Sequence, residues 1–157
     1  MQVRDFQDED APLLREIFRS AILRHAAADY DANQVAAWVA NADDASAFDA
    51  RMRLRRPLVA LLADRPVGYA DLQPDGLIDH FFVAGEHGRR GVGNALMTCI
   101  HAVARARGID ALRADVSRTA QGFFRRHGFR GEVEQAVEVR GVVLHNLPMH
   151  KRLRGEA

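Results

Sequence analysis

The sequence is poor in cysteine and has no long apolar run, and each absence excludes a class of protein. Its single cysteine, Cys99, can form no internal disulfide and supplies no cysteine pair to a metal. No apolar stretch approaches the ~18 residues that span a bilayer. The first ten residues, MQVRDFQDED, lack the apolar core of a signal peptide. We therefore expect a cytoplasmic protein with no membrane partner.

A strong excess of one charge and the usual metal-binding spacings are also missing. The net charge is +1, so no overall electrostatic field would recruit nucleic acid. The seven histidines show neither an HxxxH nor an HExxH spacing, and we predict no metal site. The chain of 157 residues is long enough to bury a substantial core, so residues 1–157 are expected to form a single domain.

Hydrophobic spacing predicts early helices followed by alternating strands and helices. Apolar residues recur at helical spacing over 8–27, 31–40, 45–54, 91–107 and 117–128. Alternating or β-rich segments predict a strand over 2–6, two strands within 57–72 joined by a turn at Asp64–Pro66, strands over 77–83 and 111–116, and two within 129–150 with a turn at Arg140–Gly141. This order predicts a mixed α/β domain.

Four glycines lie within nine residues, directly before the helix expected from residue 91: Gly85, Gly88, Gly91 and Gly93. The first N–H groups of a helix have no partner inside it, and small residues allow phosphate oxygens to reach them. Arg89 and Arg90 add positive charge at the same place. The segment therefore predicts a pyrophosphate site, for which the glycines clear space.

Other interpretations of this glycine segment are weaker or incomplete. The P-loop pattern fails because no lysine follows the glycines. The dinucleotide pattern lacks its third glycine, since Leu96 stands there, although Asp115 lies near the place of its acidic residue. A flexible turn without a ligand is the remaining alternative.

The segment VAGEHGRRGVG, residues 83–93, resembles the acetyl-CoA-binding motif of the GNAT N-acetyltransferase superfamily. Val83, Gly91 and Gly93 match the valine and the two glycines of that motif. Gly88 stands where the family prefers arginine or glutamine. Because this loop binds phosphate largely through main-chain N–H groups, we expect the change to weaken recognition little.

A second segment, SRTAQGFFRRHGF (residues 117–129), resembles the later family pattern Asn-x-x-Ala-x-x-x-Tyr-x-x-x-Gly-Phe. Together the two matches cover about residues 57–129, and the ends of the chain show a weaker similarity to some bacterial acetyltransferases. The resemblance implies the acyl-CoA N-acyltransferase fold, a central and mostly antiparallel mixed sheet flanked by helices. It also implies acetyl-CoA as co-substrate and allows a homodimer.

The resemblance further implies which residues hold acetyl-CoA. They lie at the end of the strand before the loop, in the loop, at the start of its helix and in the later segment: Phe82, Val83, Gly88, Arg89, Arg90, Gly91, Val92, Gly93, Asn94, Ser117 and Phe124. Phe124 falls at the family's tyrosine, which commonly protonates the leaving thiolate, so either another group does this or the thiolate leaves without a dedicated acid. Ser117, at the asparagine position, is expected to hydrogen-bond the pantetheine arm and to cap the following helix.

Acetyl transfer to an amine needs a group that removes a proton, because an alkyl ammonium has a pKa near ~10.4. Many members of the family carry an acidic residue on the strand that corresponds to 77–83, so the catalytic candidates are Asp79 first and His80 second, with Ser117 assisting. Strand alternation would place the Asp79 and His80 side chains on opposite faces. Asp71 is a weaker alternative base. Asp79 could instead be a strand-edge residue bound to backbone or to an arginine.

The resemblance implies that the first two helices and the final hairpin shape the acceptor pocket. Its candidate residues are Tyr30, Trp38, Asp71, Asp79 and His145. Tyr30 and Trp38 could equally anchor the second helix to the core. Cys99 falls on the apolar stripe of its helix, so we expect it in the core and not as a nucleophile.

These observations predict an acetyl-CoA-dependent N-acetyltransferase that moves the acetyl group to a primary amine of a small molecule or peptide by direct transfer in a ternary complex. The alternative is a non-catalytic acyl-CoA-binding sensor, for which Phe124 and the altered loop leave room. A third hypothesis, a nucleotide-binding regulator, predicts binding of ATP or NAD instead.

Overall fold

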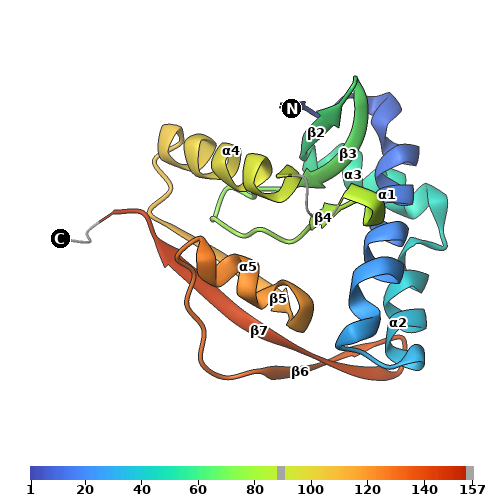
Figure 1. The fold of residues 1–157 in the computed structure, drawn as a ribbon. Coiled ribbons are helices and arrows are strands. Elements are labelled where there is room, and N and C mark those ends of the chain that lie inside the picture. The colour runs from blue at the N-terminus through green and yellow to red at the C-terminus, as the bar shows by residue number, and fades with distance from the viewer. Residues whose placement is uncertain (88–90, 155–157) are drawn as a thin grey trace.

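The computed structural model describes residues 1–87 and 91–154, which form two antiparallel sheets (Figure 1). The first sheet has the strand order β1 (Gln2–Asp5), β2 (Leu58–Leu62), β3 (Arg65–Ala70) and β4 (Phe81–Val83). The second has the order β5 (Ala111–Ser117), β7 (Val142–Arg152) and β6 (Gln135–Val139). A parallel bridge between Leu77 and Arg113 links them. The predicted mixed, mostly antiparallel sheet is confirmed.

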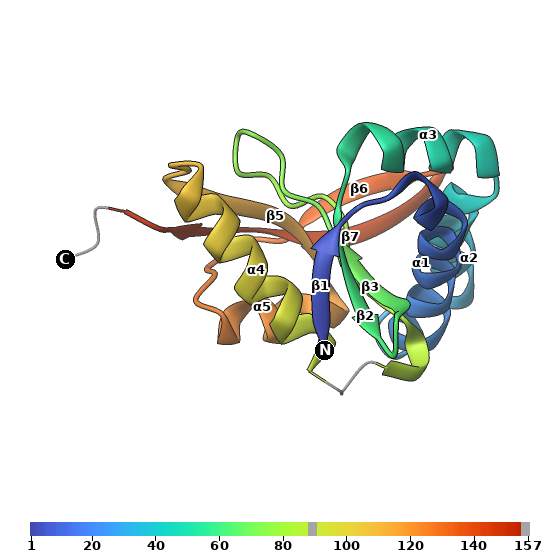
Figure 2. The ribbon, with the colours of Figure 1, turned by 90° about the horizontal axis from the view of Figure 1, so that it is seen from above.

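Helices cover both faces of the first sheet, as Figure 2 shows from above. On one face α1 (Ala11–His25) contacts β3 and β4, and α2 (Ala32–Val39) and α3 (Ala45–Arg55) pack against α1. On the other face lies α4 (Val92–Ala106), while α5 (Gln121–Arg126) packs against β5. Short 3-10 turns occupy Asp8–Asp10, Ala26–Ala28, Ala40–Ala42, Gly85–His87 and Arg118–Ala120.

The early helices begin at residues whose side chains favour a helix start, which explains why the local sequence predicted these helices. Asp31 and Asp44 cap α2 and α3, because their carboxylates accept the N–H groups three residues ahead, at 2.9 and 3.0 Å. Pro12 lies in the first turn of α1, where its missing N–H costs no hydrogen bond. Asp10 is buried and pairs with Arg4 at 2.7 Å instead of capping α1 with its side chain. That carboxylate therefore ties β1 to the start of the first helix.

Two hydrophobic clusters form the core, one on each face of the first sheet. The first joins α1, α2 and α3 to the sheet, and the second joins α4 and α5 to both sheets. The buried stripe of α4 contains Val92, Leu96, Met97, Ile100 and Ala104. Cys99 is only half-buried beside this stripe, so its expected place in the core is wrong. Burial still raises the pKa of its thiol, which does not favour a nucleophilic role.

Two strand boundaries differ from expectation. The β2–β3 hairpin turns at Ala63–Asp64, whose φ values are 49° and 64°, earlier than the predicted turn. The predicted strand over 77–83 is also wrong in its first half, because only Phe81–Val83 is regular strand. The turn at Arg140–Gly141 lies where it was expected.

Candidate active site

The two sheets part beyond the Leu77–Arg113 bridge, and two cavities open there. One has a volume of about 430 Å³ and the other about 830 Å³, and we call them the smaller and the larger cavity. Their walls have six residues in common: Trp38, Phe81, Phe82, Ser117, Ala120 and Phe124. Because they share this wall, the two cavities adjoin.

The larger cavity is bounded by the start of α4 and the end of β4. Gly91 precedes α4 with a φ of 77°, a conformation that favours glycine, and a Cβ there would meet no atom within 4 Å. Gly93 and Asn94 line the same cavity. The first N–H groups of a helix need partners from outside the helix, so this end of the cavity is suited to an anion.

Different physical requirements explain the glycines at different positions of the loop. A Cβ on Gly85 would lie 2.6 Å from Cβ of Arg24, so this glycine permits close packing on α1. A Cβ on Gly93 would lie 3.1 Å from the ring of Phe123 on α5. The expectation that every glycine clears space for a phosphate is therefore wrong for Gly85 and incomplete for Gly93. Gly88, Arg89 and Arg90 lie outside the described residues.

The free edge of β4 faces the gap between the sheets. The backbone C=O of His80 and N–H of Ala84 form hydrogen bonds on the β3 side, at 3.0 and 2.8 Å. Since successive residues of a strand direct these groups to alternate sides, the N–H and C=O groups of Phe81 and Val83 face the gap. They are donors and acceptors in the wall of the larger cavity.

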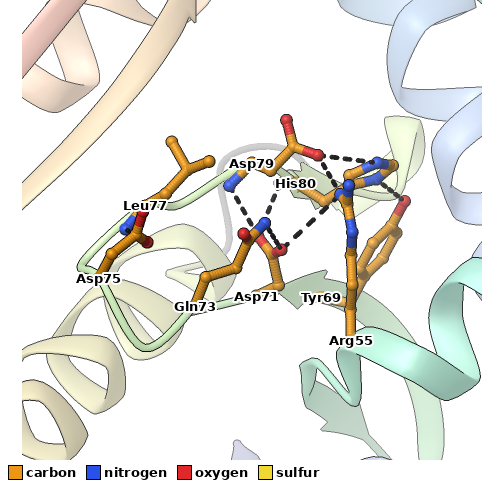
Figure 3. Close-up of polar contacts among 8 residues, drawn as sticks. All are labelled: Arg55, Tyr69, Asp71, Gln73, Asp75, Leu77, Asp79 and His80. Atoms are coloured by element: carbon orange, nitrogen blue, oxygen red, sulfur yellow. Dashed lines mark hydrogen bonds and ion pairs between the residues drawn. The ribbon is translucent and has the colours of Figure 1, made fainter.

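A buried carboxylate explains why the strand before β4 is irregular. Asp71 is 1% exposed, and its Oδ1 accepts the backbone N–H groups of both Asp79 and His80, at 2.7 and 2.8 Å (Figure 3). Two consecutive N–H groups cannot point to one side in a regular strand, so the chain kinks here. Burial raises the pKa of Asp71, and the two N–H donors oppose that shift.

Asp79 and Arg55 form an ion pair in the smaller cavity. Arg55 reaches from α3 to Oδ2 of Asp79 and also lies 3.8 Å from Oδ2 of Asp71 (Figure 3). The Asp79 side chain is 42% exposed, whereas that of Asp71 is 1% exposed. The cavity wall includes Asp79 but not Asp71. Asp71 thus positions the segment and does not face an acceptor, contrary to its predicted place in the pocket.

His80 is a buried neutral histidine at the base of the same cavity. Its Nδ1 forms a 2.9 Å hydrogen bond with the hydroxyl of Tyr69, and its Nε2 lies 3.9 Å from Oδ2 of Asp79 (Figure 3). Burial lowers the pKa of His80 to about 4, against the opposing charge of Asp79 and with help from Arg55. The imidazole is therefore uncharged at neutral pH.

The remaining predicted residues come together at the cavities, although their contacts differ from expectation. Tyr30 donates its hydroxyl to the C=O of His145 at 2.8 Å and accepts the N–H of Arg118 at 2.9 Å, so it both lines the smaller cavity and fixes the segment before α2 to β7. Trp38 lines both cavities, and His145 lines the smaller one. The Ser117 side chain makes no capping hydrogen bond, and that prediction is wrong.

Phe124 and Val92 are both buried but differ in exposure to the cavities. Phe124 is 3% exposed and lies in the shared wall. Val92 packs its side chain into the core, so a role in ligand binding is left to its backbone.

Two arginines of α3 were missed by sequence reasoning. Arg51 and Arg55 both line the smaller cavity and lie one helical turn apart. Their spacing is a signal that they share a face, but arginines on the polar side of a helix ordinarily face solvent. Asn41 and Asn146 of the same wall were also missed.

Residues 1–87 and 91–154 contain neither a candidate membrane span nor a candidate metal site. None of the helices in this part of the chain has the length and apolar character needed to cross a membrane. Within the same residues, no three His, Cys, Asp or Glu side chains lie together as a metal site requires.

Comparison with known proteins identifies the family. A model of the acetyltransferase (GNAT) domain family matches residues 26–153. The N-acetyltransferase YafP of Escherichia coli (strain K12) is 32% identical over 149 residues, which make up 95% of this chain and 94% of that protein.

Solved structures agree with this assignment. A GCN5-related N-acetyltransferase from Rhodopseudomonas palustris superposes with a TM-score of 0.92 at 35% identity, covering 97% of this chain and 95% of that one. PaiA N-acetyltransferase from Thermoplasma acidophilum, solved with coenzyme A, shares the fold with a TM-score of 0.73 at 16% identity, covering 96% and 98% of the two chains. The matches span most of the chain, which therefore belongs to the GNAT family and is an N-acetyltransferase.

Proposed function

We propose that this enzyme transfers an acetyl group from acetyl-CoA to the primary amine of a small molecule or peptide, directly and within one ternary complex. The observation that carries the proposal is the wall that the two cavities share. A donor in the larger cavity and an acceptor in the smaller one would meet at Phe81, Ser117 and Phe124. We infer that residues 1–157 act as a single domain.

The larger cavity suits acetyl-CoA. Structures of relatives that share the fold contain coenzyme A or acetyl-CoA. The open conformation at Gly91 and the free N–H groups at the start of α4 fit a pyrophosphate, and the free edge of β4 fits the amide groups of pantetheine. Gly88, Arg89 and Arg90 remain predicted contacts. When bound, acetyl-CoA supplies a thioester carbonyl that is open to attack by the amine.

Asp79 is the proposed proton acceptor. Arg55 engages its Oδ2, while Oδ1 forms no hydrogen bond within the described residues and the side chain is 42% exposed in the cavity. A carboxylate there attracts the ammonium form of the acceptor and accepts its proton on the way to attack. His80 is neutral and lies beside this carboxylate, so it is the second candidate.

The leaving thiolate needs little assistance, because a thiol has a pKa near ~8.5. Phe124 has no hydroxyl, but Ser117 lies in the shared wall and its side chain makes no hydrogen bond to the described part of the chain. We assign Ser117 a hydrogen bond to the pantetheine arm or to the departing sulfur.

Two measurements test this function. Acetyl-CoA at a hundred times its dissociation constant should raise the melting temperature by roughly 5–10 °C, with ATP and NAD as controls. Free thiol should then appear in step with an N-acetylated product when primary amines are added. A rise with NAD or ATP alone would mean that the loop binds another phosphate ligand, and binding of acetyl-CoA without turnover of any amine would indicate a sensor.

A further inference from the structure

The smaller cavity contains charges that the protein itself does not neutralise. Arg55 is paired with Asp79, but Arg51, one turn earlier on α3, makes no side-chain hydrogen bond and no ion pair within residues 1–87 and 91–154. Arg51 is half-buried, and no carboxylate of the described residues forms an ion pair with its guanidinium. Such a charge is stabilised by an anion that enters with the ligand.

An exposed carboxylate with no partner among the described residues lines the same cavity. Asp115 on β5 lines its wall and forms no ion pair or hydrogen bond with the described residues. It lies two residues before Ser117, so both side chains are on one face of β5, about 7 Å apart along the strand. Ser117 belongs to the wall shared with the larger cavity. The free negative charge therefore lies near the proposed site of transfer.

Apolar side chains form another part of the wall. Aromatic side chains come from α1, α2 and β4, and aliphatic side chains come from the β6–β7 hairpin: Phe18, Trp38, Phe82, Val137, Val139 and Leu144. A ligand that matches these features carries a cation, an anion and an apolar body. The volume of about 430 Å³ suits a molecule of a few hundred daltons or less.

We propose that the acceptor is an amino acid with an apolar side chain, its carboxylate held by Arg51 and its ammonium group facing Asp79 and Asp115. This inference rests on the proposed function and specifies its substrate class. Arg51 is suited to the task because a guanidinium binds a carboxylate through two parallel hydrogen bonds. The charge of Arg51 also reaches His80, whose pKa it lowers, which places the proposed anion site near the site of proton transfer.

The test compares acceptors that differ only at the carboxylate. Leucine, methionine and phenylalanine are each assayed beside their carboxamide and their decarboxylated amine, with wild type, Arg51→Met and Arg53→Met. Arg53 is the matched control, because it lies on the same helix but is exposed and outside the cavity. Each variant is compared with wild type on the same acceptor, so the different basicities of the three amines do not affect the comparison.

We expect Arg51→Met to lower kcat/KM for the amino acids by roughly ten- to a hundredfold and to leave the two acceptors without a carboxylate unchanged, since hydrogen bonds to charged groups are the strong ones. Arg51→Lys should recover part of the loss, and Arg53→Met should match wild type. An equal loss on all three acceptors, or no loss on the amino acids while the amines are acetylated, would overturn the inference and leave the proposed function standing.

A binding measurement decides the matter even if no amine is turned over. Calorimetry with N-acetyl-phenylalanine and N-acetyl-phenylethylamine, in the presence of coenzyme A, measures the carboxylate contribution without catalysis. Tighter binding of the acid that is lost in Arg51→Met supports the anion site. Equal binding of the two, or equal weakening of both by the variant, contradicts it. Failure of thiol release with every amine would count against the proposed function alone.

Discussion

The two cavities that meet at Phe81 and Phe124 are built in different ways. In the larger one the proposed coenzyme contacts are largely backbone groups, at the start of α4 beside Gly91 and along the free edge of β4. The smaller one is formed by charged, polar, aromatic and aliphatic side chains from α1, α2, α3, β4, β5, β6 and β7. A backbone site is suited to a constant ligand, and a side-chain site can change its specificity by substitution. The difference explains why the donor is easier to infer than the acceptor.

The largest effect is expected from a substitution in the smaller cavity. Asp79→Asn keeps the size of the side chain but removes its charge, so turnover should fall by about 10²–10⁴-fold if the carboxylate accepts the proton. Affinity for acetyl-CoA should not change. The measurement is kcat and its pH profile, together with calorimetry for the coenzyme.

Asp75→Asn is the matched control for Asp79. Asp75 lies in the same loop but is exposed and pairs with Arg113 outside the cavity, at 2.6 Å. Its substitution should leave turnover at the wild-type value. If Asp79→Asn behaved like this control, the proton would leave through another group, with His80 the next to test.

The next largest effect is expected on stability in acid, through His80 in the smaller cavity. The folded-state pKa of His80 is lowered from 6.5 to about 4, so the unfolded chain binds the proton first as the pH falls. The fold therefore loses about 3 kcal/mol of stability from this group between pH 6.5 and pH 4, with the full contribution present above pH 6.5. Urea denaturation of wild type and His80→Gln across this range measures the difference. Parallel curves for the two proteins would contradict it.

A substitution at Gly91 tests the role of the larger cavity. Valine there would force a side chain into a left-handed conformation and into the mouth of the larger cavity, so affinity for acetyl-CoA should fall by about a hundredfold through lost main-chain contacts. Gly141→Val is the control, because Gly141 has a φ of 80° and equally open surroundings but lies in the β6–β7 turn. Similar losses of affinity in both variants would show that the loop at Gly91 does not contribute specifically to coenzyme binding.

The smallest effect is expected at Cys99. It is half-buried on α4, belongs to the wall of neither cavity, and has a thiol whose pKa is raised by burial. Cys99→Ala should cost about 1 kcal/mol of stability and leave turnover unchanged. Complete loss of turnover in a folded variant would instead favour a covalent acetyl-enzyme.

The same contrast separates what the sequence could predict from what it could not. The loop before α4 and the segment over 117–129 are each continuous in sequence, so their resemblance to the family's motifs was enough to predict the family and fold, which are confirmed. The sequence could not show why residues 85 and 93 must be glycine, because the neighbours that a Cβ would meet there, Arg24 and Phe123, belong to distant segments.

The acceptor side depended on long-range contacts. Asp71 ends the regular strand by binding the N–H groups of Asp79 and His80, which lie eight and nine residues later, and no local pattern announces this. Arg51 and Arg55 have the pattern of surface arginines until α3 is docked beside the cavity. Tyr30 and Trp38 were predicted both as anchors and as wall residues, and Tyr30 does both.

The most direct test of the account is the initial-velocity pattern with acetyl-CoA and an acceptor amine varied together. A shared wall between the cavities predicts that both substrates are bound when the acetyl group moves, so double-reciprocal lines should intersect. Parallel lines, with thiol released before the amine binds, would mean that the acetyl group first forms a covalent bond with the enzyme, and would contradict direct transfer between the two cavities.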